Sequence, residues 1–168
     1  GDDEFRGLGG WDWIVGSEGR DRYDGGSGQD MVAYTQATGS VTASLLLGRG
    51  TAGAASGDYY TSIESLSGGN FDDDLTGDHG RNKLRGMYGE DTLRGNGGND
   101  TLEGGGSDDL IFGGAGWDRA LYAHNRADYE IVTNGNMTTV RYLPGRGEGT
   151  DTLYDVEALF FADETVYL

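Results

Sequence analysis

Residues 25–33 read Gly25-Gly26-Ser27-Gly28-Gln29-Asp30-Met31-Val32-Ala33, and variants of this nine-residue unit recur on both sides of it. In two blocks an acidic or amide residue falls at every ninth place: Asp3, Asp12, Asp21 and Asp30, then Asp73, Asn82, Asp91, Asp100, Asp109 and Asp118. A large apolar residue stands two places after nine of these ten. A glycine stands five places before each, wherever the chain extends that far. The unit is G-G-x-G-x-D-x-U-x, with U apolar, and such a period predicts a stacked repeat architecture.

The nine positions of the unit divide into a turn and a strand. Positions 1 to 6 form the turn, because glycine allows the positive φ values that other residues avoid. Positions 7 to 9 form a short strand whose apolar middle residue faces the interior. Two units make one coil of 18 residues, so turns two units apart stack on the same edge and a cation can sit between them. The ligands on offer are carboxylate and carbonyl oxygens, which favour calcium over zinc or magnesium.

This pattern resembles the calcium-binding nonapeptide repeat of the RTX, or hemolysin-type, family, as found in serralysin-like proteases, RTX toxins and alginate epimerase R-modules. The resemblance implies an all-β fold, a parallel β-roll that is a right-handed β-solenoid. We expect four parts. Residues 1–33 and 68–121 form two repeat blocks, residues 34–67 form an out-of-phase β connecting segment, and residues 122–168 form a C-terminal β cap built on a hairpin.

Pairing each position 6 residue with the one 18 places later gives six candidate calcium sites, about six bound Ca²⁺ ions in all. The pairs are Asp3–Asp21, Asp12–Asp30, Asp73–Asp91, Asn82–Asp100, Asp91–Asp109 and Asp100–Asp118. In the family, the earlier turn of a pair lends the carbonyls of positions 2 and 4, which here belong to Leu8, Gly10, Gly69, Phe71, Asp78, Gly80, Met87, Gly89, Asn96 and Gly98. The later turn lends those of positions 1 and 3, which here belong to Gly16, Glu18, Gly25, Ser27, Gly86, Tyr88, Gly95, Gly97, Gly104, Gly106, Gly113 and Ala115.

The net charge points to cations as partners. The chain has 29 acidic and 12 basic residues, a formal charge of -17, which argues against binding to nucleic acid or to an anionic membrane. Six divalent ions would bring that charge to about -5, so we expect folding and metal loading to be one event. Aspartates outside the repeat frame are expected to be solvated charges: Asp2, Asp24, Asp72, Asp74, Asp78 and Asp108.

Several residues depart from the unit. Asn82 replaces a carboxylate by an amide, so its site should be the weakest. Phe71 and Ser107 occupy turn positions that prefer glycine, and the small Ala120 marks the expected end of the roll.

A second similarity links the connecting segment to the tail. Residues 58–66 align with residues 151–159 at an Asp, an Ile or Val, a Glu and a Leu. Glu64 and Glu157 hold the same place in this echo, and a structural hydrogen bond to backbone is a better explanation for them than catalysis. In the tail, two apolar stretches flank Asn134-Gly135-Asn136, which is typical of a hairpin.

The sequence favours a non-catalytic module. It has no cysteine, no apolar stretch long enough to span a membrane and no visible signal peptide, and its two histidines lack a nucleophile, base and orienter arrangement. The RTX resemblance implies export by a type I secretion apparatus, a secreted, extracellular or cell-surface location, and folding on calcium outside the cell. Two alternatives are a carbohydrate-binding accessory module, with Trp11, Trp117, Tyr88 and Arg119 on a polysaccharide surface, and a calcium-dependent adhesin or surface-layer segment.

Overall fold

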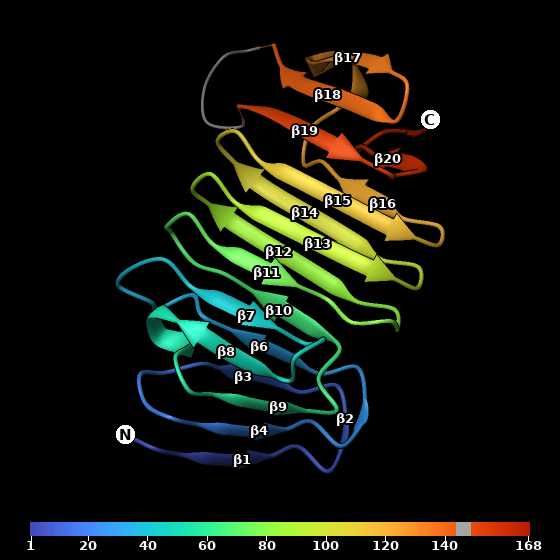
Figure 1. The fold of residues 1–168 in the computed structure, drawn as a ribbon. Coiled ribbons are helices and arrows are strands. Elements are labelled where there is room, and N and C mark those ends of the chain that lie inside the picture. Colours follow the sequence, from blue (N-terminus) through green and yellow to red (C-terminus); the bar gives the residue numbers. More distant parts are fainter. Residues whose placement is uncertain (144–148) are drawn as a thin grey trace.

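The computed structural model describes residues 1–143 and 149–168, and these residues form two long β-sheets that face each other (Figure 1). The larger sheet has the order β1 (Glu4–Arg6), β4 (Arg22–Asp24), β9 (Tyr59–Thr61), β8 (Arg49–Ala52), β7 (Thr42–Ser44), β11 (Asp74–Thr76), β13 (Thr92–Gly97), β15 (Leu110–Ala115), β19 (Thr150–Tyr154), β18 (Met137–Tyr142) and β17 (Tyr129–Asn134). The smaller has the order β21 (Thr165–Tyr167), β20 (Ala158–Phe160), β16 (Arg119–Leu121), β14 (Thr101–Gly106), β12 (Lys83–Tyr88), β10 (Ser65–Ser67), β6 (Met31–Ala33) and β3 (Trp13–Val15).

Short elements complete the fold. Strands β2 (Gly9–Gly10) and β5 (Ser27–Gly28) pair with each other in two stacked turns. The helical segments of the described residues are two 3₁₀ turns, η1 (Gly53–Ala55) and η2 (Arg126–Asp128). In these same residues no helix has the length and apolar character needed to cross a membrane.

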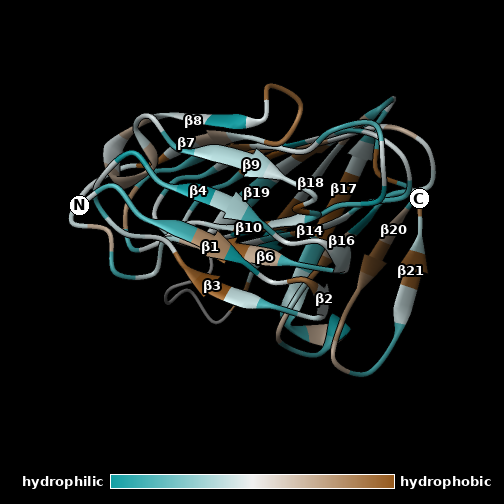
Figure 2. Ribbon diagram, turned by 90° about the horizontal axis from the view of Figure 1, so that it is seen from below, coloured by the Kyte–Doolittle hydropathy of each residue, from teal (hydrophilic) through white to brown (hydrophobic). Residues whose placement is uncertain are grey.

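Consecutive repeat units alternate between the two sheets. Leu84 pairs in parallel register with Leu102 in one sheet, and Leu93 pairs with Ile111 in the other, so partners lie 18 residues apart. The position 8 residues face inward and stack: Leu75, Leu84, Leu93 and Leu102 are each fully buried. The structure is therefore the parallel β-roll that the resemblance to the RTX family implied. Figure 2 shows the two layers of strands from below.

The segment expected to be an out-of-phase connection contributes strands to both sheets. In the smaller sheet Leu66 of β10 pairs with Val32 on one side and with Leu84 on the other, so that sheet runs through both blocks without a break. The reason is that Leu66 lies nine residues before Leu75 and thus already belongs to the frame of the second block. In the larger sheet, β7 and β8 lie between β9 and β11, and β8 runs antiparallel to both of its neighbours.

The roll does not end at Ala120. Ala120 is fully buried and pairs in parallel register with Leu159 of β20, while Ile111 pairs with Leu153 of β19, so the tail adds one further coil. The expected hairpin is present as β17 and β18, with Gly135 at φ 65° in its turn. Residues 144–148 of the expected cap lie outside the described residues.

The two echoed segments have the same architecture. In each, an antiparallel strand (β8 or β18) is followed by a strand in the larger sheet (β9 or β19) and then by a strand in the smaller sheet (β10 or β20). Both of these last strands pair in parallel with the final strands of a repeat block, β6 and β16. The sequence similarity of residues 58–66 and 151–159 thus reflects a repeated structural unit that closes each block.

Candidate metal sites

The later aspartate of each predicted pair contacts the turn one coil earlier through its carboxylate. Asp91 Oδ1 accepts a hydrogen bond from the Asp73 backbone N–H at 2.7 Å, and Asp118 Oδ1 accepts one from the Asp100 N–H at 2.7 Å. The same contact joins all six pairs predicted from the sequence, at 2.7 to 2.9 Å. We call this series the aspartate ladder. It brings together the carboxylates of stacked turns and holds most of them away from solvent.

The second carboxylate oxygen of several ladder residues is buried without a hydrogen-bond partner. These oxygens are Oδ2 of Asp12, Asp30, Asp91, Asp100 and Asp118. A buried carboxylate oxygen with no donor is costly, and native proteins rarely leave one in that state. Burial accordingly raises the pKa of Asp91 to about 8 and that of Asp100 to about 6, and it also raises the pKa of Asp118. A cation placed beside these oxygens would offset that cost.

In most turns the glycine at position 1 leaves room beside this oxygen. A Cβ atom on Gly86 would overlap Asp91 Oδ2 and would lie 2.6 Å from the carbonyl oxygen of Gly104 in the next turn of the same edge. A Cβ on Gly95 would likewise overlap Asp100 Oδ2 and lie 2.5 Å from the Gly113 carbonyl oxygen. A carboxylate oxygen and a carbonyl oxygen therefore converge on one small space, which only glycine leaves open.

Other turn carbonyls point across the same gap. At position 4, a Cβ on Gly28 would overlap the carbonyl oxygen of Gly10, and one on Gly98 would overlap that of Gly80. At position 2, a Cβ on Gly105 would overlap the Met87 carbonyl oxygen. The carbonyls of positions 2 and 4 thus face the later turn, and that of position 1 faces back. The described residues contain no cluster of three His, Cys, Asp or Glu side chains able to hold a metal, so a cation would need these carbonyls.

Two pairs in the second block depart from this arrangement. Asp73 Oδ2 accepts a hydrogen bond from the Gly69 N–H at 2.6 Å, so it is not without a donor. Asn82 Oδ1 accepts one from the Asp78 N–H at 2.7 Å, and its Nδ2 donates to the Glu64 carbonyl at 3.2 Å. Toward the preceding coil, Asn82 is therefore a hydrogen-bond donor, whereas the aspartates at this position are acceptors. Its amide also brings no charge to the turn.

At Asp21 the protein itself fills the corresponding space. Asp21 Oδ2 accepts hydrogen bonds from Ser17 Oγ at 3.0 Å and from the Tyr23 hydroxyl at 2.9 Å. The ring of Tyr34 lies where a Cβ on Gly16 would be. Of the predicted pair, Asp3 is exposed and its N–H donates to Asp21 Oδ1.

A sequence profile of the RTX calcium-binding nonapeptide repeat (4 copies) matches residues 1–32, 67–102 and 85–119, which is half of the chain. The chain belongs to the RTX calcium-binding repeat family. A search of curated proteins finds no match. Among solved structures, the extracellular lipase LipA from Serratia marcescens is similar over 60% of this chain and 15% of the lipase, with 24% identity and a TM-score of 0.30. The chain thus spans a small part of that lipase.

Outside the matched RTX units, two further aspartates extend the ladder. Asp58 Oδ1 accepts the Asp21 N–H at 2.8 Å, and Asp151 Oδ1 accepts the Asp109 N–H at 3.1 Å. Both carboxylates are buried. The sequence did not single them out as site residues, although each occupies the Asp place of the echoed segment and precedes an inward-facing residue, Tyr60 or Leu153, by two places.

The two echoed glutamates make the expected backbone hydrogen bonds. Glu64 Oε2 accepts the Asp30 N–H at 2.9 Å, and Glu157 Oε2 accepts the Asp118 N–H at 2.6 Å. The prediction of a structural hydrogen bond is confirmed for both residues.

Several off-frame carboxylates form a second series of contacts. Asp2, Asp72 and Asp108 each accept, through Oδ1, a backbone N–H from the next coil: those of Arg20, Glu90 and Thr150. All three are exposed, as expected of solvated charges, and they also cap backbone N–H groups at the edge of the turns. Of the two turn residues singled out as unsuited to the turn, Ser107 adopts φ 85°, whereas Phe71 does not have a positive φ. Leu8, Met87 and Asn96 also hold positive φ values without glycine.

The tryptophans differ in their surroundings. Trp117 packs edge-on against Phe160, with ring centroids 6.4 Å apart, whereas Trp11 is 83% exposed. His124 stacks on Tyr142 and His79 is exposed.

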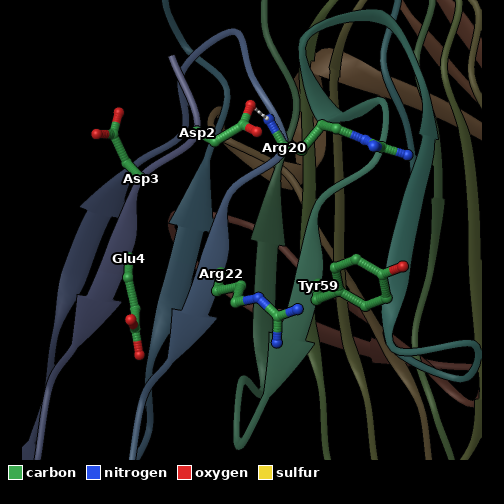
Figure 3. A pocket seen from close by; sticks show the side chains of 6 residues that line it. All are labelled: Asp2, Asp3, Glu4, Arg20, Arg22 and Tyr59. Carbon is green, nitrogen blue, oxygen red and sulfur yellow. Dashed lines mark hydrogen bonds between the residues drawn. The ribbon is translucent and has the colours of Figure 1, made fainter.

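Figure 3 shows a pocket of about 410 Å³ near the N-terminal edge, where strands β1, β4 and β9 lie side by side. The Arg22 guanidinium lies over the Tyr59 ring at 5.4 Å, and Asp2 accepts the Arg20 N–H. Glu4, Arg22 and Tyr59, which line this pocket, are partners across the three neighbouring strands.

Proposed function

We propose that this chain is the calcium-dependent folding module of a protein exported by type I secretion, and that it folds when it meets calcium outside the cell. RTX repeats bind calcium, and proteins that carry them are generally exported in this way. The observation that carries the proposal is the set of buried, unpartnered Oδ2 oxygens, each facing a carbonyl of the next coil. An all-oxygen donor set of this kind suits calcium.

The ligands we propose are the ladder carboxylates and the turn carbonyls at positions 1 to 4 of stacked RTX units, in the repeat blocks 1–33 and 68–121. In the pairs Asp12–Asp30, Asp91–Asp109 and Asp100–Asp118 the earlier Oδ2 is buried without a donor and lies near the position 1 carbonyl of the later turn, so we assign them the strongest sites. Asn82–Asp100 is weaker because the amide carries no charge. Asp3–Asp21 is weaker because Asp21 Oδ2 already has two donors.

Calcium would act here as part of the fold. Its charge would lower the repulsion among the acidic residues of a chain with formal charge -17. The free energy of calcium binding would then supply the free energy of folding. Extracellular calcium modules bind with Kd of about 10⁻⁴ to 10⁻³ M, so the chain would remain unfolded where calcium is scarce and fold where it is abundant.

Circular dichroism during a calcium titration tests the proposal. We expect an unfolded spectrum in chelator and a cooperative gain of β structure at millimolar calcium, with no comparable gain in magnesium. A chain that is already fully β-structured in chelator, and unchanged by calcium, would refute calcium-dependent folding. RTX repeat modules are not catalytic, and we place any activity of the parent protein outside these residues.

A second candidate function has a specific observation in its favour. A groove of about 270 Å³ on the smaller sheet is lined by Trp11, Arg81, Lys83 and Arg119 among others. Three cations beside an exposed indole, on an otherwise acidic chain, suit an acidic polysaccharide, whose rings can stack on tryptophan. Calorimetry with a uronate polymer in calcium, comparing the wild type with Trp11→Ala, tests it. Absence of heat with the wild type would remove this candidate.

A further inference from the structure

We propose two additional calcium sites outside the RTX units, one between Asp30 and residues 62–64 and one between Asp118 and residues 155–157. They rest on the proposed calcium binding of the repeat turns, but they use residues that the repeat motif does not contain. Each site would close the end of a repeat block.

The space beside Gly25 and Gly113 has the same two oxygens as a repeat site. A Cβ on Gly25 would lie 2.5 Å from Asp30 Oδ2 and would overlap the carbonyl oxygen of Ser62. A Cβ on Gly113 would lie 2.9 Å from Asp118 Oδ2 and would overlap the carbonyl oxygen of Asp155. Ser62 and Asp155 thus replace the position 1 glycine of a following turn.

The backbone that presents these carbonyls is unusual and is the same in both segments. Ser62 has φ 50° and Asp155 has φ 52°, although neither is glycine. The two residues occupy the same place in the aligned segments 58–66 and 151–159, and both are exposed, so side-chain packing does not hold them in this conformation. A left-handed backbone costs a non-glycine residue free energy and is commonly kept for a function.

Glu64 and Glu157 replace the aspartate of the later turn. Each precedes an inward-facing leucine, Leu66 or Leu159, by two places, as a repeat aspartate does, and each accepts the N–H of the earlier aspartate. The spacing from the preceding ladder aspartate, Asp58 or Asp151, is six residues instead of nine. The backbone stays against the earlier turn, because the N–H groups of Glu64 and Glu157 donate to the carbonyls of Asp30 and Asp118 at 3.2 and 3.0 Å.

In each earlier carboxylate one oxygen belongs to the ladder and the other has no donor. Asp30 and Asp118 are fully buried, and Oδ2 of each has no hydrogen-bond donor. The opposite edge of the coil to which residues 58–66 belong provides the contrast, because there Ser17, Tyr23 and the Tyr34 ring occupy the space around Asp21 Oδ2. This chain therefore supplies its own groups at one edge of that coil and leaves a negatively charged space at the other.

The direct test is a crystal structure in calcium, with anomalous scattering used to locate the ions. We expect peaks beside Ser62 O and Asp155 O in addition to peaks in the repeat turns. Occupied repeat turns with both of these places empty would overturn the inference and leave the proposed function intact. Absence of calcium everywhere would overturn the proposed function and the inference with it.

Counting bound calcium in solution tests the role of the glutamates. Glu64→Gln and Glu157→Gln keep the hydrogen-bond acceptor and remove the charge, so each should lower the number of ions bound near the midpoint concentration by one, and the double variant by two. Glu90→Gln, at an exposed position, is the control and should bind the wild-type number. Wild-type stoichiometry and affinity in both single variants, with the fold verified by circular dichroism, would contradict a ligand role for these residues.

Discussion

The backbone N–H of Asp73 donates to Oδ1 of Asp91, one coil further along the roll, at 2.7 Å. The same carboxylate directs its buried Oδ2 toward the space beside Gly86 and the Gly104 carbonyl. One oxygen of Asp91 therefore joins two coils and the other faces the proposed ion. Asp91 also belongs to two candidate pairs, with Asp73 and with Asp109.

This double role predicts a large effect of Asp91→Asn. The amide can keep one ladder contact but removes charge from two sites, so the calcium affinity of each site should fall by about tenfold, the effect of about 1.4 kcal/mol, and the calcium concentration at the folding midpoint should rise. Asp24→Asn, at an exposed off-frame aspartate, is the matched control and should leave the midpoint unchanged. Calcium titration by circular dichroism measures both. Equal midpoints in the two variants would count against the ladder as the binding element.

Acid should partly replace calcium. Burial raises the pKa of Asp91 to about 8 and of Asp100 to about 6, whereas an unfolded aspartate has a pKa of about 3.9. Between about pH 4 and pH 8 the metal-free fold binds more protons than the unfolded chain, so its stability falls as the pH rises. In chelator, β structure should increase on acidification from pH 8 toward pH 4. A β content independent of pH across this range would contradict the prediction.

Met87→Gly should stabilise the roll. Met87 holds φ 91° at position 2, where a left-handed conformation costs a side-chain-bearing residue about 1 to 2 kcal/mol. Glycine removes that cost but loses about 0.5 to 1 kcal/mol of chain entropy, so the net gain should be about 0.5 to 1 kcal/mol. Lys83→Gly, at the start of the same strand, should be destabilising. Denaturant unfolding in saturating calcium compares the two, and a loss of stability in both would show that Met87 is not strained.

Tyr34→Phe should destabilise the coil to which residues 58–66 belong. The Tyr34 hydroxyl donates to Asp58 Oδ2 at 2.6 Å, and the residue is fully buried, so phenylalanine leaves a buried carboxylate oxygen without its donor. The expected loss is about 1 to 3 kcal/mol. Tyr59→Phe, at a ring that is 51% exposed, should cost little. Thermal unfolding in calcium decides between these outcomes, and equal melting temperatures would mean that the hydrogen bond contributes nothing.

Much of the roll follows from local sequence. The spacing of Leu84 and Leu102 predicted their pairing, and the six ladder pairs lie together as their 18-residue separation indicated. Repeats can be read this way because each unit contacts its neighbours at a constant separation along the chain.

Other features depend on contacts between residues whose separation in sequence is not a multiple of nine. Asp21 reaches Asp58 across 37 residues and Asp30 reaches Glu64 across 34, neither a multiple of nine. The sequence showed that residues 58–66 and 151–159 are alike but not which turns they close. It also gave no indication that the Tyr34 ring fills the space beside Gly16.

The sequence by itself determined the unit, the 18-residue coil, the inward-facing residues and the all-oxygen character of the turns, because these are properties of a short motif repeated at a constant distance. Only the tertiary structure decided which carboxylate oxygens have donors and which do not, since that depends on side chains such as Ser17 and Tyr23 and on where two irregular segments rejoin the sheets. A buried charge is costly unless it is paired, and which group lies close enough to pair with it depends on the three-dimensional arrangement of the chain.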